Sequence, residues 1–161
     1  MRARILILGY GNTLRGDDGL GCRAAERLTH LDGRSGVRVI AAHQLGIDFA
    51  ELVADAELVV FIDASREGLP GELRTSNVRS LPATEAEAVM THHLTPETLL
   101  AVSRVLYGGA PEAVVVTLTG AAFDLSEELS PIVQAELPGL VQKVERLVRK
   151  HAEQFEPGSP A

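Results

Sequence analysis

Three short apolar runs divide the chain, and each consists almost entirely of aliphatic residues with no regular polar alternation. The runs are Arg4–Leu8 (RILIL), Leu58–Ile62 (LVVFI) and Ala113–Leu118 (AVVVTL). Runs of this length and composition are typical of strands that are buried on both faces of a parallel sheet. Val37–Ala42 and a shorter run at Glu72–Thr75, which we expect at a sheet edge, bring the predicted sheet to about five strands.

Segments with helical spacing of apolar residues separate these runs. Four helices are predicted, over Asp17–Leu28, Gly46–Asp55, Pro96–Leu106 and Leu129–Ala152. Pro138, near the start of the last helix, predicts a kink or a break there, because proline lacks the backbone N–H of a helical hydrogen bond. The alternation of strands and helices predicts an α/β protein, a three-layer α/β/α sandwich with a mostly parallel sheet.

Size and composition exclude several classes of protein. The 161 residues suit one domain, which we place at residues 1–152, followed by a disordered tail at 153–161. The net charge of -7 is spread along the chain without a Lys/Arg cluster, and no stretch approaches the roughly 18 apolar residues that cross a bilayer. Cys22 is the only cysteine and excludes an internal disulfide. We therefore expect a soluble cytoplasmic protein that binds neither nucleic acid nor membrane.

The loop after the first predicted strand, Gly9–Asp18 (GYGNTLRGDD), is the first place where chemistry is expected. It begins like a dinucleotide-binding fingerprint, but Leu14 stands where the third glycine should be, and the ending of a P-loop is missing. Asp17 and Asp18 place two carboxylates beside the start of a helix, where they would repel a phosphate and attract a cation. Nucleotide binding is therefore disfavoured, although charge complementation of the helix start alone remains an alternative explanation of the two aspartates.

Two further polar segments are expected at the same edge of the sheet, because ligands of parallel sheets bind beyond the carboxyl ends of the strands. Asp63 follows the run LVVFI, and Thr91–His93 (THH) precedes the helix that begins at Pro96. Two carboxylates and an imidazole from three loops predict a mixed site for a metal such as nickel, zinc or cobalt. Two alternatives stay open: Asp63 as the cap of a turn, and His43, which follows the second strand, as an outer member of the site.

Four segments in this order resemble the hydrogenase maturation proteases. They are Ile5–Gly21 (ILILGYGNTLRGDDGLG), Phe61–Ala64 (FIDA), Thr91–Leu94 (THHL) and Phe123–Pro131 (FDLSEELSP). The resemblance implies a phosphorylase/hydrolase-like α/β/α fold with a twisted five-stranded sheet. It also implies that Asp18, Asp63 and His92 are the catalytic and metal-contacting residues. His92 matches the family position better than His93, and the aspartate at position 18 departs from the glutamate that is frequent there.

The function that the resemblance implies is endopeptidase activity of aspartic or metal-dependent type. The substrate would be the precursor of a nickel-iron hydrogenase large subunit, from which a C-terminal extension is removed. The precursor would supply the nickel, for which zinc or cadmium could substitute in crystals. A non-catalytic module that checks the nickel of the same precursor, or chaperones it, is the alternative. The loop over Ser76–Met90 is where we expect specificity for the precursor.

Overall fold

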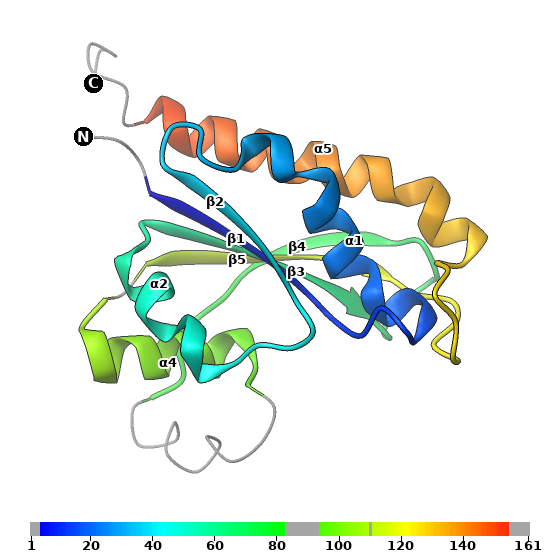
Figure 1. Cartoon of the computed structure of the whole chain (residues 1–161), viewed down its shortest axis with the longest axis horizontal. Coiled ribbons are helices and arrows are strands. Elements are labelled where there is room, and N and C mark those ends of the chain that lie inside the picture. The colour runs from blue at the N-terminus through cyan, green and yellow to red at the C-terminus, as the bar shows by residue number, and fades with distance from the viewer. Residues whose placement is uncertain (1–3, 83–93, 110, 155–161) are drawn as a thin grey trace.

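The structure is a computed structural model that describes residues 4–82, 94–109 and 111–154. Five strands form one sheet (Figure 1): β1 Ile5–Tyr10, β2 Val37–Ala42, β3 Leu58–Ser65, β4 Leu73–Asn77 and β5 Glu112–Thr119. The α-helices of the described part are α1 Leu20–Arg27, α2 Ala50–Asp55, α4 Pro96–Tyr107 and α5 Pro131–Glu153. Short 3-10 turns precede α1 (η1, Gly16–Gly19) and α2 (η3, Ile47–Phe49).

The sheet order is β2-β1-β3-β5-β4, and β4 alone runs antiparallel to its neighbour. The chain leaves β1 for β2 on one side and returns to β3 on the other side of β1. The gap between the ends of β1 and β3 is therefore a topological switch point, the usual binding place of an open α/β sheet. We call the side of the sheet where β1, β2, β3 and β5 end the carboxyl edge, and the opposite side the amino edge.

Helices cover both faces of the sheet, α1 and α5 on one and α2 and α4 on the other (Figure 1). Each face has its own apolar cluster. Ile7, Ile62 and Leu140 belong to the cluster beneath α1 and α5, whereas Leu8, Phe61 and Leu99 belong to the cluster against α2 and α4. The predicted three-layer sandwich with a mostly parallel five-stranded sheet is confirmed. No helix in the described ranges is long and apolar enough to cross a membrane.

Two glycines bring α1 against the strands at very short range. A Cβ on Gly21 would lie 2.4 Å from the carbonyl oxygens of both Tyr10 and Ile62, and one on Gly9 would lie 2.0 Å from the carbonyl oxygen of Gly21. Any larger residue at these positions would push the helix off the sheet. Gly9 lies inside β1 and beneath α1, where close packing requires a residue without a Cβ.

Pro138 does not break the last helix. The helix α5 runs from Pro131 to Glu153 with Pro138 inside it. Proline removes one hydrogen bond of the helix, but Val133, Leu137 and Leu140 are all buried against the sheet and keep one apolar face through the site of the proline. Packing of that face compensates for the lost bond, so the predicted break is wrong.

Three predicted boundaries shift near the site. The strand β3 extends to Ser65, so Asp63 lies inside the strand and does not follow it. Asp17 and Asp18 lie in the turn η1, and α1 begins only at Leu20. The predicted loop begins later than expected, because Ser76 belongs to β4; its part from residue 83 onward lies outside the described residues, as do residues 155–161 of the predicted tail.

Candidate active site

Asp17 is a fully buried structural anchor. Its carboxylate accepts four hydrogen bonds: from the backbone N–H of Ala121 (2.7 Å), Ala122 (3.0 Å) and Ser130 (2.7 Å), and from the Ser130 hydroxyl (2.7 Å). Burial alone would raise the pKa of Asp17, but these hydrogen bonds outweigh it and hold the pKa below its ordinary value. A saturated carboxylate of this kind has no oxygen left for a ligand.

The Asp17 contacts fasten the loop before α5 to the loop before α1, more than 100 residues earlier in the chain. Backbone hydrogen bonds add to the junction, since the Gly16 N–H donates to the Ser126 carbonyl (2.8 Å) and the Ser126 N–H donates to the Leu14 carbonyl (2.9 Å). The two loops lie side by side at the carboxyl edge (Figure 1). The late segment Phe123–Pro131 therefore belongs to the same edge as the acidic loop.

Asp63 has the opposite surroundings. Register pairs Gly9 of β1 with Ile62, so Asp63 stands one residue beyond the end of the β1 pairing, at the switch point. Its Oδ1 accepts the N–H of Ala64 at 2.8 Å. Burial raises the pKa of Asp63 to about 6, the hydrogen bonds from Ala64 and the Tyr10 hydroxyl oppose that rise, and the charge of Asp18 adds to it. Asp63 is thus a carboxylate that has lost its hydration, and its hydrogen bonds only partly replace that loss.

Asp18 is half-buried in η1, a turn that packs over the end of β3. Its Oδ2 accepts the backbone N–H of Asn12 at 2.9 Å. Within the described part of the chain, its Oδ1 has no hydrogen-bond partner. The turn that holds Asp18 therefore packs against the strand that holds Asp63, and the charge of Asp18 acts on Asp63.

Tyr10 is a residue of the site that was not predicted from the sequence. It ends β1 on the face that carries Leu6 and Leu8, the face toward α4. Burial and then the negative charge of Asp63 hold the pKa of Tyr10 well above its usual value, so the hydroxyl keeps its proton and can donate to Asp63. The alternation along β1, read with the strand order, was the signal that could have placed Tyr10 beside Asp63.

Sequence comparison places two curated proteins close to this chain over nearly its whole length. No protein-family model matches it. A protein of Methanocaldococcus jannaschii, provisionally named a hydrogenase maturation protease, is 29% identical over 152 residues, which cover 92% of each chain. The hydrogenase expression/formation protein HupD of Rhodobacter capsulatus is 28% identical over 91% of this chain and 71% of its own.

Solved structures agree with the sequence relatives. The [NiFe] hydrogenase maturation protease HycI of Thermococcus kodakarensis superposes with a TM-score of 0.72 at 26% identity, covering 92% of this chain and 94% of its own. The hydrogenase maturating endopeptidase HybD of Escherichia coli has a TM-score of 0.70 at 24% identity, over 91% and 93% of the two chains, and supports the fold. This chain belongs to the hydrogenase maturation protease family.

The third residue expected of a hydrogenase maturation protease site, His92, lies outside the described residues together with Thr91 and His93. The first described residue after them, Leu94, packs in the cluster that contains Tyr10 and Leu99. Leu94 therefore lies just before α4, on the face of the sheet that carries Tyr10. The described ranges alone contain no group of three His, Cys, Asp or Glu side chains placed to hold a metal ion.

His43 follows β2 at the carboxyl edge and is exposed, and its place as an outer member of the site stays a prediction. Cys22 is buried, its thiol donates to the Ala42 carbonyl at 3.0 Å, and burial raises the pKa of Cys22. A thiol held in its protonated form makes a poor nucleophile, so Cys22 acts here as a packed core residue.

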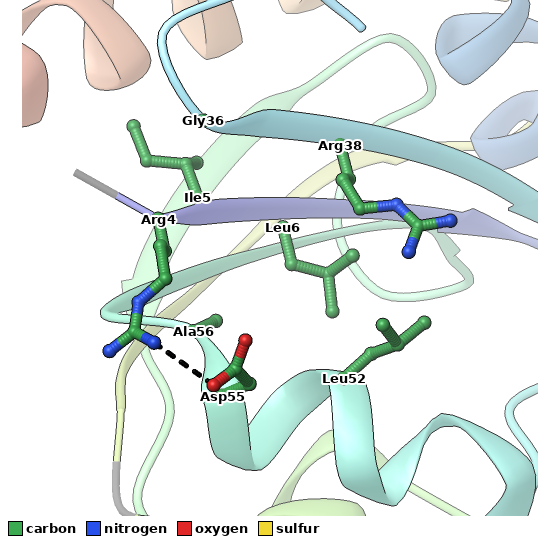
Figure 2. Close-up of a pocket in the computed structure, with 8 residues that line it drawn as sticks. All are labelled: Arg4, Ile5, Leu6, Gly36, Arg38, Leu52, Asp55 and Ala56. Carbon is green, nitrogen blue, oxygen red and sulfur yellow. Dashed lines mark hydrogen bonds and ion pairs between the residues drawn. The ribbon is translucent and has the colours of Figure 1, made fainter. Parts of the chain in front are cut away.

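A small cavity of about 90 Å³ lies at the opposite, amino edge (Figure 2). Arg4 at the start of the sheet pairs with Asp55 of α2 at 3.0 Å, and Leu6 and Leu52 form the apolar floor. This cavity contains none of the paired carboxylates of the carboxyl edge. The candidate site therefore lies at the carboxyl edge, on the far side of the sheet from this cavity.

Proposed function

We propose that this protein is an endopeptidase that removes a C-terminal extension from the nickel-loaded precursor of a nickel-iron hydrogenase large subunit. Membership of the hydrogenase maturation protease family supports this class of reaction and substrate. The observation that carries the proposal is the approach of Asp18 to Asp63 at the switch point of the sheet. Two carboxylates that repel one another at a partly dry edge are suited to receive a cation.

The proposed catalytic and metal-contacting set is Asp18, Asp63 and His92. Asp63 lies in β3, and Asp18 lies in η1, the turn that packs over the end of that strand. In the sequence, His92 stands two residues before Leu94, which packs in the cluster that contains Tyr10. Two carboxylates and one imidazole form a ligand set that nickel accepts.

The nickel is cargo of the precursor in this proposal. A precursor that carries nickel would complete its coordination with Asp18, Asp63 and His92, whereas an empty precursor would lack that attachment. Nickel held in this way would polarise the carbonyl of the scissile peptide. Trimming would then follow only after correct metal loading, which makes the reaction a check on maturation.

Hydrolysis also needs a base. The water oxygen bonds to the carbonyl carbon, the C–N bond breaks, and one proton of the water must pass to the leaving nitrogen. Asp63 is the candidate for this role, through the carboxylate oxygen that does not contact the nickel; before the metal arrives, burial raises its pKa to about 6, close to neutral pH. Asp17 does not, since all of its oxygen contacts are used by the fold.

The test is the intact mass of nickel-loaded and nickel-free precursor after incubation with the purified protein. We expect a nickel-dependent loss of a C-terminal peptide with the unmodified protein and no loss with Asp18→Ala or His92→Ala. His30→Ala, which changes an exposed histidine before β2 and outside the set, is the matched control and should trim normally. His93→Ala shows which of the two adjacent histidines contacts the metal. If His92 is the ligand, trimming should be lost in His92→Ala and kept in His93→Ala.

Two outcomes would contradict the proposal. Trimming that survives in both Asp18→Ala and His92→Ala would disprove the assignment of the site. Tight, nickel-dependent binding of the precursor without any mass change would instead favour the non-catalytic module that checks or chaperones the loaded precursor.

A further inference from the structure

Three strongly exposed leucines come from three separate loops at the carboxyl edge. Leu14 follows β1, Leu69 follows β3 and Leu125 follows β5, and their exposed fractions are 55%, 78% and 79%. One exposed leucine is ordinary on a protein surface. Three from different loops at the edge that carries the candidate site are the kind of apolar feature that marks a binding surface. We call these three residues the leucine rim.

Leu14 and Leu125 are held next to one another by the backbone. The N–H of Ser126, the neighbour of Leu125, donates to the carbonyl of Leu14 at 2.9 Å, and Arg15 and Ser126 form an isolated parallel bridge. The Asp17 anchor lies directly behind this junction. The two side chains therefore project from a fixed double loop, which lowers the entropy lost when a partner binds.

The turn that carries Leu69 is fastened to the same loop. The guanidinium of Arg66 lies 3.8 Å from the centre of the Phe123 ring, and the N–H of Gly71 donates to the carbonyl of Thr119 at 2.7 Å. Both contacts join the β3–β4 turn to the end of β5 and the segment after it. All three leucines thus stand on loops that are tied into one preformed surface.

The rim is also continuous with the candidate site. The N–H of Leu14 donates to the Asn12 side chain at 2.9 Å, and the N–H of Asn12 donates to Asp18 at 2.9 Å. A single turn therefore holds a rim leucine and a proposed metal-contacting carboxylate. A polypeptide that places its metal at Asp18 must pass over or beside Leu14.

We infer that the leucine rim is a docking surface for an apolar segment of the hydrogenase large-subunit precursor, next to the bond that is cleaved. This inference rests on the proposed function for the identity of the partner. The rim would bind the polypeptide of the precursor, and the carboxylates would bind its metal. Affinity for the precursor and recognition of its nickel would then come from separate parts of the carboxyl edge. Leucine side chains in such a rim contribute to KM and leave kcat almost unchanged.

The experiment compares Leu14→Ser, Leu69→Ser, Leu125→Ser and the triple variant with Leu106→Ser. Leu106 is the matched control, since it is 52% exposed near the end of α4, at the amino edge. With nickel-loaded precursor, each rim variant should raise KM several-fold and the triple variant about a hundredfold, with kcat retained. Leu106→Ser should match the unmodified protein, and all variants should keep the same midpoint of thermal unfolding.

The outcomes separate the rim from the proposed function. Normal KM in the triple variant, beside normal trimming by the unmodified protein, would overturn the rim and leave the endopeptidase intact. Absence of trimming, with precursor binding that the triple variant loses, would support the rim and overturn the endopeptidase. Absence of both binding and trimming would overturn both. A dimer that only the unmodified protein and Leu106→Ser form would show that a second copy covers the rim, and would overturn its assignment to the precursor.

Discussion

Asp17 and Asp63 are both withdrawn from water, but the protein surrounds them in opposite ways. Asp17 accepts four hydrogen bonds, including three from backbone N–H groups, and its pKa is lowered. Asp63 accepts the Ala64 N–H and faces the Tyr10 hydroxyl and the charge of Asp18, and its pKa rises to about 6. The first carboxylate stabilises the fold as an anion, whereas the second is an anion that the fold tolerates at a cost.

Two aspartates at the same edge of the sheet thus have different roles: Asp17 stabilises the fold, and Asp63 is available for chemistry. A group whose hydrogen bonds are complete has nothing to offer a ligand, while an under-compensated carboxylate gains from meeting a cation or a proton. Because the two aspartates carry the same functional group, the same substitution at each should have opposite consequences for stability and activity.

Replacement of Asp63 by asparagine should abolish trimming. The amide keeps the shape of the side chain but cannot take a proton from water or supply a charged ligand. We expect kcat/KM for the nickel-loaded precursor to fall by about 10³-fold or more, in the range lost with a general base. Intact-mass time courses measure the rate, and circular dichroism checks the fold. Activity within tenfold of the unmodified protein would remove Asp63 from the chemistry.

Replacement of Asp17 by asparagine should destabilise the protein instead. The NH₂ group of asparagine would face at least one of the N–H or O–H donors that now bind the carboxylate. That buried donor would lose its acceptor. We expect the free energy of unfolding to fall by about 3–5 kcal/mol, measured by urea denaturation. Asp124→Asn in the same loop, where the side chain is exposed, should change it by less than about 0.5 kcal/mol. Equal effects at both positions would contradict the anchor.

Stability should respond to pH with opposite signs at the two sites. The pKa of Asp63 is raised in the folded state, so the cost of ionising it grows as pH rises from about 3.8 to about 6 and is fully present above pH 6. Asp63→Asn should therefore stabilise the protein by about 2–3 kcal/mol at pH 8 and by little at pH 4. The pKa of Asp17 is lowered, so its contribution is present above pH 3.8 and is lost as pH falls below it. Denaturation at pH 8 and pH 4 measures the change at Asp63, and denaturation well below pH 3.8 measures the change at Asp17.

The sequence was sufficient to predict the layers and most strands of this fold, because those follow from local patterns. The runs at Leu58 and Ala113 are uninterrupted and apolar, and the helix α4 begins at Pro96 as predicted. Thr95 caps it, since the Thr95 side chain accepts the Thr98 N–H at 3.2 Å. The family resemblance selected Asp18 and Asp63, and the structure brings their loops together. Their roles, with that of His92, remain predictions.

The division of labour between Asp17 and Asp18 could not be predicted from the sequence. Both stand in one turn, and local rules treat them alike. The decision rests on Ser130, 113 residues away, whose N–H and hydroxyl both bind Asp17. This contact also explains why Ser130, the residue before the last helix, does not cap that helix: its side chain is directed to Asp17. Contacts between distant loops leave no periodic signal in the sequence.

Replacement of Tyr10 by phenylalanine should shift the pH dependence of trimming without unfolding the protein. The hydrogen bond from the Tyr10 hydroxyl lowers the pKa of Asp63, so its loss should raise that pKa above about 6. The acidic limb of the kcat/KM profile should then move to higher pH, with a modest loss of rate at pH 7. Tyr107→Phe, which changes an exposed tyrosine at the end of α4, is the control. An unmoved limb would separate Tyr10 from the chemistry.

Replacement of Asp55 by asparagine should have the smallest effect, and it tests the amino edge. The Arg4–Asp55 ion pair beside the cavity of Figure 2 is 3.0 Å long, but its side chains are 55% and 71% exposed. Exposed pairs contribute about 0–1 kcal/mol because water and salt screen them. We expect urea denaturation to show a change of less than about 1 kcal/mol that disappears in high salt, with normal trimming. A loss of trimming would mean that the amino edge takes part in the reaction, and the contrast between anchored and reactive carboxylates would then extend beyond the carboxyl edge.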